Sequence, residues 1–376
     1  MIGWKMGKKV LRCAEFFSGI GGMRYACHQA APSDTSVEFI ASFDINQIAN
    51  HVYHHNFQEN PITVNVEHLP VKYYEDLRAD IWLMSPPCQP YTRGGSLLDD
   101  QDNRAIGLLH LVSVLQKMEN PPDYIFVENV LNFEVSKSRS KLIDVLNERK
   151  YVVEEYLVSP LDIGIPNYRL RYYLIARRSN SSVVKPLFKD LLHIMPQPHA
   201  RPVSEYLRPP TDSTPFLVPT KYITDYKEYR HDVVHPQDVR STTFTKAYGS
   251  KHIIGTGSFL QTQNLHLRDY RKDDPQTLLT LGLRFFTPTE VALLHAFPLK
   301  SESTDNSTTG ITTLAFPSDV SIINQYRLLG NSLNVAVVNV LLKRLYSEAL
   351  FNSEALFNSE ALFESEVPFD NSTHAE

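Results

Sequence analysis

Residues 11–22, LRCAEFFSGIGG, join an apolar, strand-like run to a glycine-rich turn that leads into a helix. Glycines at the end of a buried strand let backbone N–H groups approach a ligand, and the next helix points its N-terminus there. The spacing is not GxGxxG, because Arg24 occupies the third glycine position, and it is not a P-loop. The stretch therefore predicts the first strand, turn and helix of an α/β domain and disfavours a dinucleotide ligand such as NAD.

Further strands and helices follow this start in alternation. Apolar runs at 37–44, 81–84, 124–129, 151–158 and 172–177 have the lengths of strands. Helical patterns lie near 22–31, 46–56, 104–118 and 137–150. This alternation is typical of a parallel sheet covered by helices on both faces, and ligands of such sheets bind beyond the carboxyl ends of the strands. Residues 10–178 therefore form the first part of a predicted catalytic domain, and its site is sought at the strand ends.

The rest of the chain divides into three segments. Residues 179–283 are rich in proline and lack clear periodicity, which predicts a smaller, irregular domain. Residues 284–346 return to order, with a helix expected at 288–297 and a turn followed by an apolar helix within 325–346. Residues 347–376 contain a repeated SEALFN motif. We interpret this acidic tail as a disordered extension or a fraying helix, with an interaction tail as the alternative.

Composition limits the class of protein without deciding its ligand. The net charge is −5, but the tail alone holds seven acidic residues and no lysine or arginine. The rest of the chain is therefore close to neutral, which neither requires nor excludes a nucleic-acid partner. Three cysteines argue against a disulfide scaffold. No signal peptide or membrane-length apolar run is evident, so we expect a soluble intracellular protein, cytoplasmic, nuclear or both.

Two candidate residues follow the second and third strands. Asp44 ends the second strand, where a carboxylate commonly binds ribose hydroxyls, although it could instead cap the helix that opens at Asn46. Cys88 stands among prolines in SPPCQPYTR, residues 85–93, where neither a strand nor a helix can continue. Such a loop suits an exposed thiolate nucleophile, while the alternative is a small buried hydrophobic residue.

The fourth strand and the segment before the last strand add charged candidates. Glu128 ends an apolar strand, where burial should raise its pKa and keep it able to donate a proton. Arg169 and Arg171 lie two residues apart, on one face of an extended segment. They are either a solvated charged edge or a pair of cations that hold Glu128, a base edge or a phosphate.

Metal chemistry is not predicted. His51, His54 and His55 have helical spacing, but no cysteine or carboxylate completes a ligand set. A zinc deaminase needs a second cysteine three residues after Cys88, and this position is Tyr91.

In this order, the motifs resemble the cytosine-5 methyltransferases that use S-adenosylmethionine. The motifs that carry the resemblance are FFSGIGG (16–22), Asp44, SPPCQP (85–90), ENV (128–130), NYRLR (167–171) and LLGNSLN (328–334). Within that family the chain looks most like the DNA methyltransferase 2 group, which methylates transfer RNA. The resemblance is strengthened by TTFTKAYG (242–249), GTGSFLQT (255–262) and LRFFTPTEVALLHAFP (283–298).

The resemblance implies a fold and a reaction. We expect a Rossmann-like α/β methyltransferase fold in which residues 179–283 form a target-recognition domain. The expected reaction is methylation of cytosine C5 in tRNA, at nucleotide 38 of the anticodon loop of aspartate tRNA, through a covalent bond between Cys88 and C6. S-adenosylmethionine is the expected cofactor, tRNA the expected partner and DNA a weak secondary one, with no membrane or metal involved.

Roles for individual residues also follow from the resemblance. The implied catalytic residues are Cys88, Glu128, Arg169 and Arg171. The implied cofactor-binding residues are Phe17, Ser18, Gly19, Ile20, Gly21, Gly22, Asp44, Asn65, Val66, Pro87, Asn331 and Ser332. The implied substrate-binding residues are Pro86, Gln89, Asn129, Thr243, Phe244, Thr245 and Lys246.

One departure from the group concerns Thr243, because the group usually has Cys-Phe-Thr where this chain has Thr-Phe-Thr at 243–245. The nucleophile is unaffected, but target positioning at this point becomes less certain. The same reaction on duplex DNA is the nearest alternative, and a catalytically silent nucleic-acid-binding protein is an alternative from another class.

Overall fold

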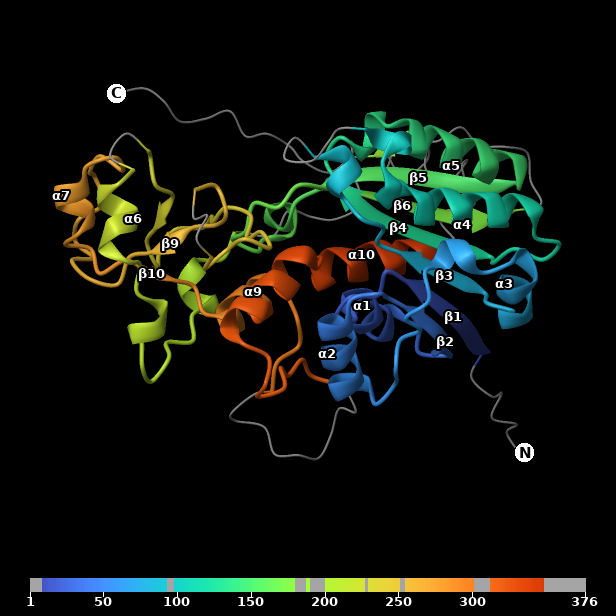
Figure 1. Ribbon diagram of the computed structural model, residues 1–376, viewed down its shortest axis with the longest axis horizontal. Coiled ribbons are helices and arrows are strands. Elements are labelled where there is room, and N and C mark those ends of the chain that lie inside the picture. The colour runs from blue at the N-terminus through green and yellow to red at the C-terminus, as the bar shows by residue number, and fades with distance from the viewer. Residues whose placement is uncertain are drawn as a thin grey trace, which may run out of the picture.

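A larger α/β lobe and a smaller lobe make up the computed structural model, which describes residues 9–92, 98–179, 187–189, 200–226, 229–250, 254–300 and 312–347 (Figure 1). The predicted loop at 301–310 and the repeat tail after Ser347 lie outside the described residues.

The larger lobe is built on a seven-stranded sheet in the order β2-β1-β3-β4-β6-β5-β7. Its strands are β1 Lys9–Phe16, β2 Thr35–Phe43, β3 Ile81–Met84, β4 Tyr124–Val130, β5 Tyr151–Val158, β6 Arg171–Arg178 and β7 Leu187–Lys189. The neighbouring strands β2, β1, β3 and β4 are parallel. Their carboxyl ends therefore meet at one edge, as predicted.

The prediction of a purely parallel sheet is wrong at β6. This strand runs antiparallel to both β4 and β5. The chain between β5 and β6 holds only a short 3₁₀ helix, Pro160–Ile163, and a parallel pair needs a longer crossover, usually through an α-helix. The reversal brings the start of β6, and with it Arg171, to the edge where the parallel strands end.

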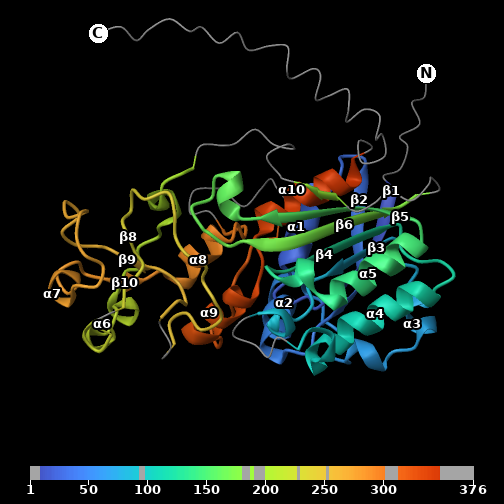
Figure 2. The same ribbon diagram turned by 90° about the horizontal axis from the view of Figure 1, so that it is seen from above.

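Helices cover both faces of this sheet (Figure 2). One face carries α1 Gly22–Ala30, α2 Gln47–Phe57 and α10 Val335–Tyr346, and the other carries α3 Val71–Leu77, α4 Ile106–Lys117 and α5 Lys137–Glu148. Successive side chains of a strand point to opposite faces, so Cys13 and Leu83 join the first core while Ala14 and Met84 join the second. Burial on both faces explains why these strands are almost wholly apolar.

The smaller lobe contains the three-stranded sheet β10-β9-β8 and two short helices (Figure 1). Its elements are β8 Val233–Val234, β9 Phe259–Leu260, β10 Arg284–Phe285, α6 Thr220–Thr224 and α7 Pro275–Leu278. This sheet thus includes residues just after the predicted boundary at 283. A buried ion pair between Arg284 and Glu290, at 2.7 Å, connects β10 to the helix that follows.

The chain returns to the larger lobe through α8 Pro288–Leu294 and α9 Ile322–Asn331. Helix α8 begins with a capping box formed by Thr287 and Glu290. A break separates α9 from α10, whose N-cap Asn334 accepts hydrogen bonds from two backbone N–H groups. This break positions Asn331 and Ser332 at the sheet edge where the site lies.

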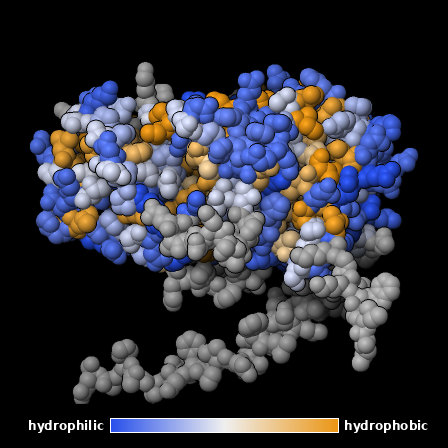
Figure 3. All heavy atoms as spheres, turned by 90° about the horizontal axis from the view of Figure 1, so that it is seen from below, coloured by the Kyte–Doolittle hydropathy of each residue, from blue (hydrophilic) through white to orange (hydrophobic). Residues whose placement is uncertain are grey.

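No helix in the described ranges is long and apolar enough to cross a membrane. On the face shown in Figure 3, hydrophobic patches are scattered among hydrophilic surface.

Candidate active site

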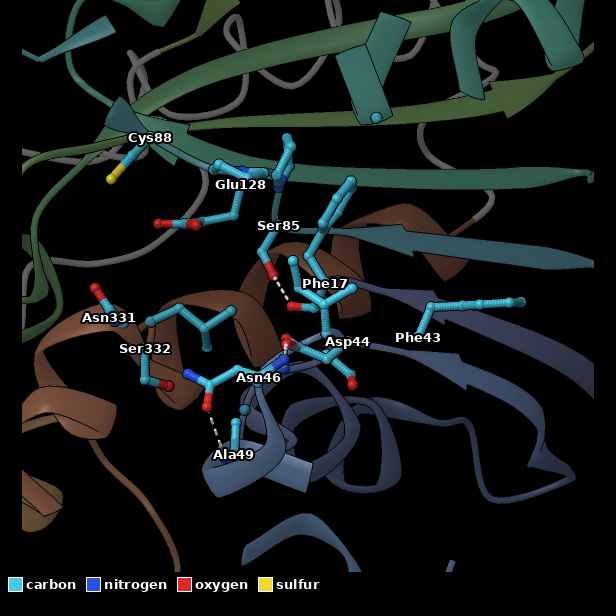
Figure 4. A pocket seen from close by; sticks show the side chains of 18 of the residues that line it. Phe17, Phe43, Asp44, Asn46, Ala49, Ser85, Cys88, Glu128, Asn331 and Ser332 are labelled. Carbon is cyan, nitrogen blue, oxygen red and sulfur yellow. Dashed lines mark hydrogen bonds between the residues drawn. The ribbon is translucent and has the colours of Figure 1, made fainter. Parts of the chain in front are cut away.

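A cavity of about 560 Å³ lies beyond the carboxyl ends of β1, β2, β3 and β4. Its walls come from the loops after these strands, from the residues just before β6, and from the end of α9. In Figure 4, Cys88 and Glu128 lie toward one side of the cavity and Asp44 and Asn46 toward the other. The sheet edge predicted from the sequence is therefore where these residues meet.

The glycine turn after β1 closes tightly around the start of α1. Phe17 has a left-handed backbone, with φ +59°, which is uncommon for a residue other than glycine, and its carbonyl accepts a 3.0 Å hydrogen bond from the Ser85 hydroxyl. Gly21 is also left-handed, at φ +82°, and a Cβ there would lie 2.4 Å from the Phe57 ring. Gly21 thus packs against α2 and does not line the cavity.

Asp44 links the glycine turn to α2. One carboxylate oxygen accepts from the Gly19 N–H at 2.7 Å and the other from the Asn46 N–H at 2.8 Å. Burial raises the pKa of Asp44, and these two hydrogen bonds oppose that rise. The N-cap role considered for Asp44 belongs to Asn46, whose side chain accepts from the N–H groups of Ile48 and Ala49. Asp44 therefore orients the turn and still lines the cavity.

The side of the cavity away from Cys88 combines apolar walls with one unpaired hydroxyl. Phe17 and Val66 line it next to Gly107, where a Cβ would come within 3.2 Å of both side chains. The Tyr74 hydroxyl fixes Val66 by donating to its carbonyl at 2.6 Å. Within the described chain, the buried hydroxyl of Ser18 has no hydrogen-bond partner, as expected of a group that meets a ligand.

Cys88 sits at the start of a short 3₁₀ helix, Gln89–Tyr91, after two prolines. Asn129 braces this loop by donating a 3.4 Å hydrogen bond to the Pro86 carbonyl. Asn132 donates to the Tyr91 carbonyl at the same distance. Cys88 is half-buried and lines the cavity, whereas Cys13 and Cys27 are fully buried.

Glu128 and Arg171 face each other beside Cys88. Arg171 Nε lies 3.8 Å from Glu128 Oε1, and both side chains are largely buried. Burial raises the pKa of Glu128, and Arg171 and then Arg169 oppose this rise. The predicted direction of the Glu128 pKa is therefore confirmed. A carboxyl with a raised pKa can act as a proton donor near neutral pH.

The Cys88 thiol has a raised pKa, chiefly because it is buried and also because Glu128 is nearby. Arg171, Arg169 and Lys246 act in the opposite direction. In the free protein, the thiol form is therefore favoured over the thiolate.

Arg169 joins three segments of the chain. Its guanidinium donates to the carbonyls of Phe244 at 3.2 Å and Gly330 at 3.3 Å, and also to the carbonyl of Ser332. Complete burial and the proximity of Arg171 lower its pKa to about 9. Arg169 lines the cavity, but its hydrogen bonds go to backbone carbonyls and so give it a structural role as well.

Most of the predicted site residues come together in this cavity. They are Phe17, Ser18, Gly19, Ile20, Gly22, Asp44, Asn65, Val66, Pro86, Pro87, Cys88, Gln89, Glu128, Arg169, Arg171, Asn331 and Ser332.

Other predicted residues do not line the cavity. Gly21 and Asn129 support it from behind, as described above. Among Thr243, Phe244, Thr245 and Lys246, the Phe244 side chain is only 1% exposed and packs on Tyr248, so it belongs to the core. Thr243 lines a different cavity. Lys246 does not line the cavity, but its charge acts on Cys88 and its backbone lies against Gly330.

Arg104 lines the cavity but was not predicted as a site residue. It lies in a 3₁₀ helix, Asn103–Ala105, where the Asp102 carboxylate accepts hydrogen bonds from its Nε and Nη2 at 2.8 and 2.6 Å. The Asp102 hydrogen bonds are the main cause that raises the pKa of Arg104, and a Cys88 thiolate adds a smaller rise, so Arg104 and Cys88 interact electrostatically. The Asp-Asn-Arg sequence at 102–104 could have indicated a charged site residue before α4, but we interpreted Arg104 only as the start of the predicted helix at 104–118.

Comparisons with known proteins agree with this geometry. The C-5 cytosine-specific DNA methylase family matches residues 11–347. The chain belongs to this family. Its members are methyltransferases that generally use S-adenosylmethionine, and the family predicted from the motif order is confirmed.

Three relatives show how far the likeness extends. A protein of Spodoptera frugiperda named tRNA (cytosine(38)-C(5))-methyltransferase is 36% identical over 91% of this chain and all of its own length. A Dictyostelium discoideum protein named DNA (cytosine-5)-methyltransferase is 35% identical over 90% of this chain and 94% of its own. The crystal structure of S. pombe Dnmt2 methyltransferase is 31% identical, with a TM-score of 0.72 over 90% of this chain and 98% of that one. The methyltransferase fold is therefore confirmed.

The described residues contain no group of three or more His, Cys, Asp or Glu side chains placed to hold a metal ion.

Proposed function

We propose that this protein transfers the methyl group of S-adenosylmethionine to C5 of cytosine in tRNA, at nucleotide 38 of the anticodon loop, with aspartate tRNA as the expected substrate. The observation that carries the proposal is that the Cys88 thiol and the Glu128 carboxyl line one cavity with the glycine turn after β1. Relatives named tRNA (cytosine(38)-C(5))-methyltransferase that cover about 90% of the chain support the choice of tRNA.

The residues of the cavity fit S-adenosylmethionine. The Asp44 carboxylate retains acceptor capacity for ribose hydroxyls, because each oxygen has a second lone pair beyond its backbone bond. Phe17 and Val66 offer apolar surface to an adenine ring, and the unpaired Ser18 hydroxyl offers a hydrogen bond to a polar group. When bound, the cofactor supplies an electrophilic methyl group.

Glu128 is the proposed proton donor to the target base. Burial raises its pKa, which favours the protonated form, and a protonated carboxyl can donate to N3 of cytosine. Arg171, 3.8 Å from this carboxyl, holds it in place and stabilises the charge it acquires on losing the proton. Protonation of N3 makes C6 more electrophilic.

Cys88 is the proposed nucleophile. Its sulfur loses a proton to solvent and forms a bond to C6, while the C5=C6 π electrons form a C4=C5 double bond and the C4=N3 π electrons move to N3, which takes up the Glu128 proton. C5 would then have the electron density to take the methyl group that the bound cofactor supplies, and the cofactor sulfur would keep the bonding pair as a neutral thioether. Loss of the C5 proton to water, return of the N3 proton to Glu128 and breakage of the bond between C6 and the Cys88 sulfur would restore the aromatic ring and free the thiolate.

An anticodon loop suits this site because the target cytosine must leave its stack before the thiol can reach C6. Extrusion costs least for a base that is already unpaired. Proteins that recognise RNA sequence also mostly bind single-stranded loops, whose bases can be splayed out.

The testing experiment measures transfer of a labelled methyl group to total tRNA and to duplex DNA side by side. Label in tRNA, lost when cytosine 38 is replaced by uridine, is the expected result. An RNA with 5-fluorocytosine at the target should trap a covalent adduct that survives denaturation, because fluorine cannot leave as the proton does. The Cys88→Ala variant should form no adduct, and full methyl transfer by this variant would exclude the proposed mechanism.

Duplex DNA is the second candidate substrate, favoured by the name of the Dictyostelium discoideum relative. Label mainly in DNA would transfer the assignment to that substrate, with Thr243 as the first residue to replace by cysteine.

A further inference from the structure

A second cavity, of about 260 Å³, lies next to the active site. Its lining residues are Tyr168, Tyr229, His231, Asp232, Thr242, Thr243, Gly255, Gly257 and Phe259. None of these residues lines the first cavity. Thr243 is predicted from the resemblance to bind substrate, and the other eight have no role in the reaction proposed above.

The two cavities are separated by the backbone of two neighbouring segments. Tyr168 lines the second cavity and Arg169, the next residue, lines the first. On the facing segment, the Thr243 hydroxyl donates to the Tyr168 carbonyl at 2.7 Å, and the Phe244 carbonyl accepts from Arg169. Because Tyr168 and Arg169 are consecutive residues, the two cavities adjoin, and an RNA strand with one nucleotide in the first cavity can place a neighbouring nucleotide at the second.

The walls of the second cavity are mainly aromatic. The rings of Tyr229 and His231 meet edge-on at 5.2 Å, and those of His231 and Phe259 lie 5.8 Å apart. Tyr168 is 41% exposed, and the guanidinium of Arg240 lies over its ring at 5.3 Å. Proteins that bind single-stranded nucleic acids stack bases on such rings.

Among the residues that the structure describes, the lining contains no lysine or arginine. Its charged member is Asp232, whose carboxylate accepts from the Thr242 hydroxyl at 3.0 Å and from the Ser258 hydroxyl. These hydroxyls fix the carboxylate as an acceptor for N–H groups. His231 is 3% exposed, and within the described chain its Nε2 has no hydrogen-bond partner. Because burial lowers its pKa, the ring is neutral near pH 7 and does not attract an anion.

Two glycines with positive φ lie in the loop that lines this cavity. Gly257 has φ +154°, and a Cβ there would lie 2.5 Å from the Tyr248 ring. At Gly255, with φ +66°, a Cβ would have no neighbour within 4 Å. The Gly255 N–H donates to the Tyr229 hydroxyl at 3.0 Å, which holds the loop against one aromatic wall.

We propose that the second cavity binds one unpaired nucleobase of the RNA substrate, next to the target cytosine, by stacking on Tyr168 and hydrogen bonding to Asp232. Guanine fits best, because its N1–H and N2–H groups both donate and a carboxylate only accepts. This inference rests on the proposed function, since it assumes that a cytosine in RNA occupies the first cavity.

The first test combines a protein change with an RNA change. Methyl transfer is measured on tRNA transcripts that carry an abasic nucleotide directly 5′ or directly 3′ of the target cytosine, with the unchanged protein and with Tyr168→Ala. At one of these positions the abasic nucleotide should lower kcat/KM about tenfold, the effect of one lost stacking contact. Tyr168→Ala should cause a similar loss on the intact tRNA, and the two changes together should cost no more than either alone.

Control variants separate stacking from loss of fold. Tyr168→Ala retains the backbone hydrogen bonds of residue 168, and Tyr168→Phe should retain most activity because the ring remains. Tyr226→Ala removes an exposed tyrosine of the smaller lobe that does not line the cavity and should leave kcat/KM unchanged. The proposal would be overturned if, for the 5′ and the 3′ abasic nucleotide alike, the loss of kcat/KM in the combination equals the product of the two separate losses. It would also be overturned if neither Tyr168→Ala nor an abasic nucleotide lowers kcat/KM.

A second readout does not depend on methyl transfer. An RNA loop carrying the fluorescent base 2-aminopurine beside the cytosine should change its emission on binding, and Tyr168→Ala should abolish this change. If the unchanged protein methylates no tRNA, the proposed function fails, but this binding signal still reports on the cavity. If the RNA binds but the 2-aminopurine emission does not change at either the 5′ or the 3′ position, the inference about the second cavity fails and the proposed function is unaffected.

Discussion

The guanidinium of Arg169 donates a 3.2 Å hydrogen bond to the carbonyl of Phe244, 75 residues further along the chain. The same side chain bonds to the carbonyls of Gly330 and Ser332. The segment before β6, the smaller lobe and the end of α9 are thus joined at one buried cation. The residues proposed for catalysis, target recognition and cofactor binding are all close to this junction, so its integrity should affect all three proposed roles.

Arg169→Lys should therefore destabilise the protein. A lysine ammonium is a single point and cannot reproduce the fork of donors that reaches separate carbonyls, so buried acceptors lose their partners. We expect a loss of about 3 kcal/mol in the free energy of unfolding, seen as a Tm lower by roughly 5 °C, and a large loss of methyl transfer. Arg271→Lys is the matched control, because its side chain is 80% exposed. Equal Tm values for Arg169→Lys and Arg271→Lys would show that the hydrogen bonds of Arg169 do not stabilise the fold.

Gly330→Ala should loosen the same junction from the other side. A Cβ at Gly330 would lie 2.2 Å from the carbonyl carbon of Thr245 and 2.3 Å from the amide nitrogen of Lys246. Both are backbone atoms, so the two segments must move apart at a cost of about 1 to 3 kcal/mol. Because Asn331 and Ser332 follow directly, cofactor affinity measured by calorimetry should fall about tenfold.

A comparison variant for this change is Gly255→Ala. Its φ of +66° strains an alanine, but its Cβ meets no atom within 4 Å. It should lower Tm less than Gly330→Ala and leave cofactor affinity unchanged. Weaker cofactor binding in both variants would show that the effect is not specific to Gly330.

Glu15 should make stability depend on pH. It is buried in β1, accepts a 2.9 Å hydrogen bond from the Tyr53 hydroxyl, and burial raises its pKa to about 8 from 4.5. A carboxyl with a raised pKa binds its proton more tightly in the folded state, so its contribution is complete below pH about 4.5. That contribution is lost progressively as the pH rises to about 8.

Urea unfolding across this pH window checks the expectation. The midpoint for the unchanged protein should fall as the pH rises, and Glu15→Gln should flatten that slope, because a glutamine does not titrate. Glu38→Gln is the control, since Glu38 is exposed on β2 and its change should leave the slope intact. An unaltered slope in Glu15→Gln would assign the pH dependence to other groups.

The Cys88 thiol should react slowly with iodoacetamide at neutral pH in the free protein. The thiolate is the reactive form, and burial together with Glu128 raises the pKa of Cys88 above its ordinary value of 9.0. Mass spectrometry of the folded protein should find alkylation only at Cys88, with a rate that rises through pH 9, because Cys13 and Cys27 are fully buried. Rapid alkylation of Cys88 at pH 7 would contradict this, and Cys88→Ser is the control.

The parts of the fold that depend on local pattern could be predicted from the sequence. β3 and β5 have their predicted limits, because a serine–proline pair follows each strand directly and proline interrupts strand pairing. The antiparallel direction of β6 could not be predicted, because nothing in an apolar run encodes its direction. Chain direction depends on the connection, and the short 3₁₀ helix at 160–163 was not recognised.

Site residues were also predictable where local sequence pattern places them and not where tertiary packing does. Cys88, Asp44 and Glu128 lie at strand ends, so the alternation of elements predicted where they would meet. Arg104 was missed because it reaches the cavity from a helix start. Phe244 was predicted to touch substrate, yet its ring packs on Tyr248 and Phe286, a tertiary arrangement of aromatic residues from distant segments that sequence spacing does not reveal.

Asn331 and Ser332 complete a cavity whose proposed nucleophile, Cys88, comes far earlier in the chain. A ribosome adding about 5 to 20 residues per second needs on the order of tens of seconds to pass from one to the other. During that interval the nascent polypeptide has its thiol and its glycine turn but no complete pocket around them. Methyl transfer can therefore begin only after α9 and α10 have been synthesised and folded against the sheet.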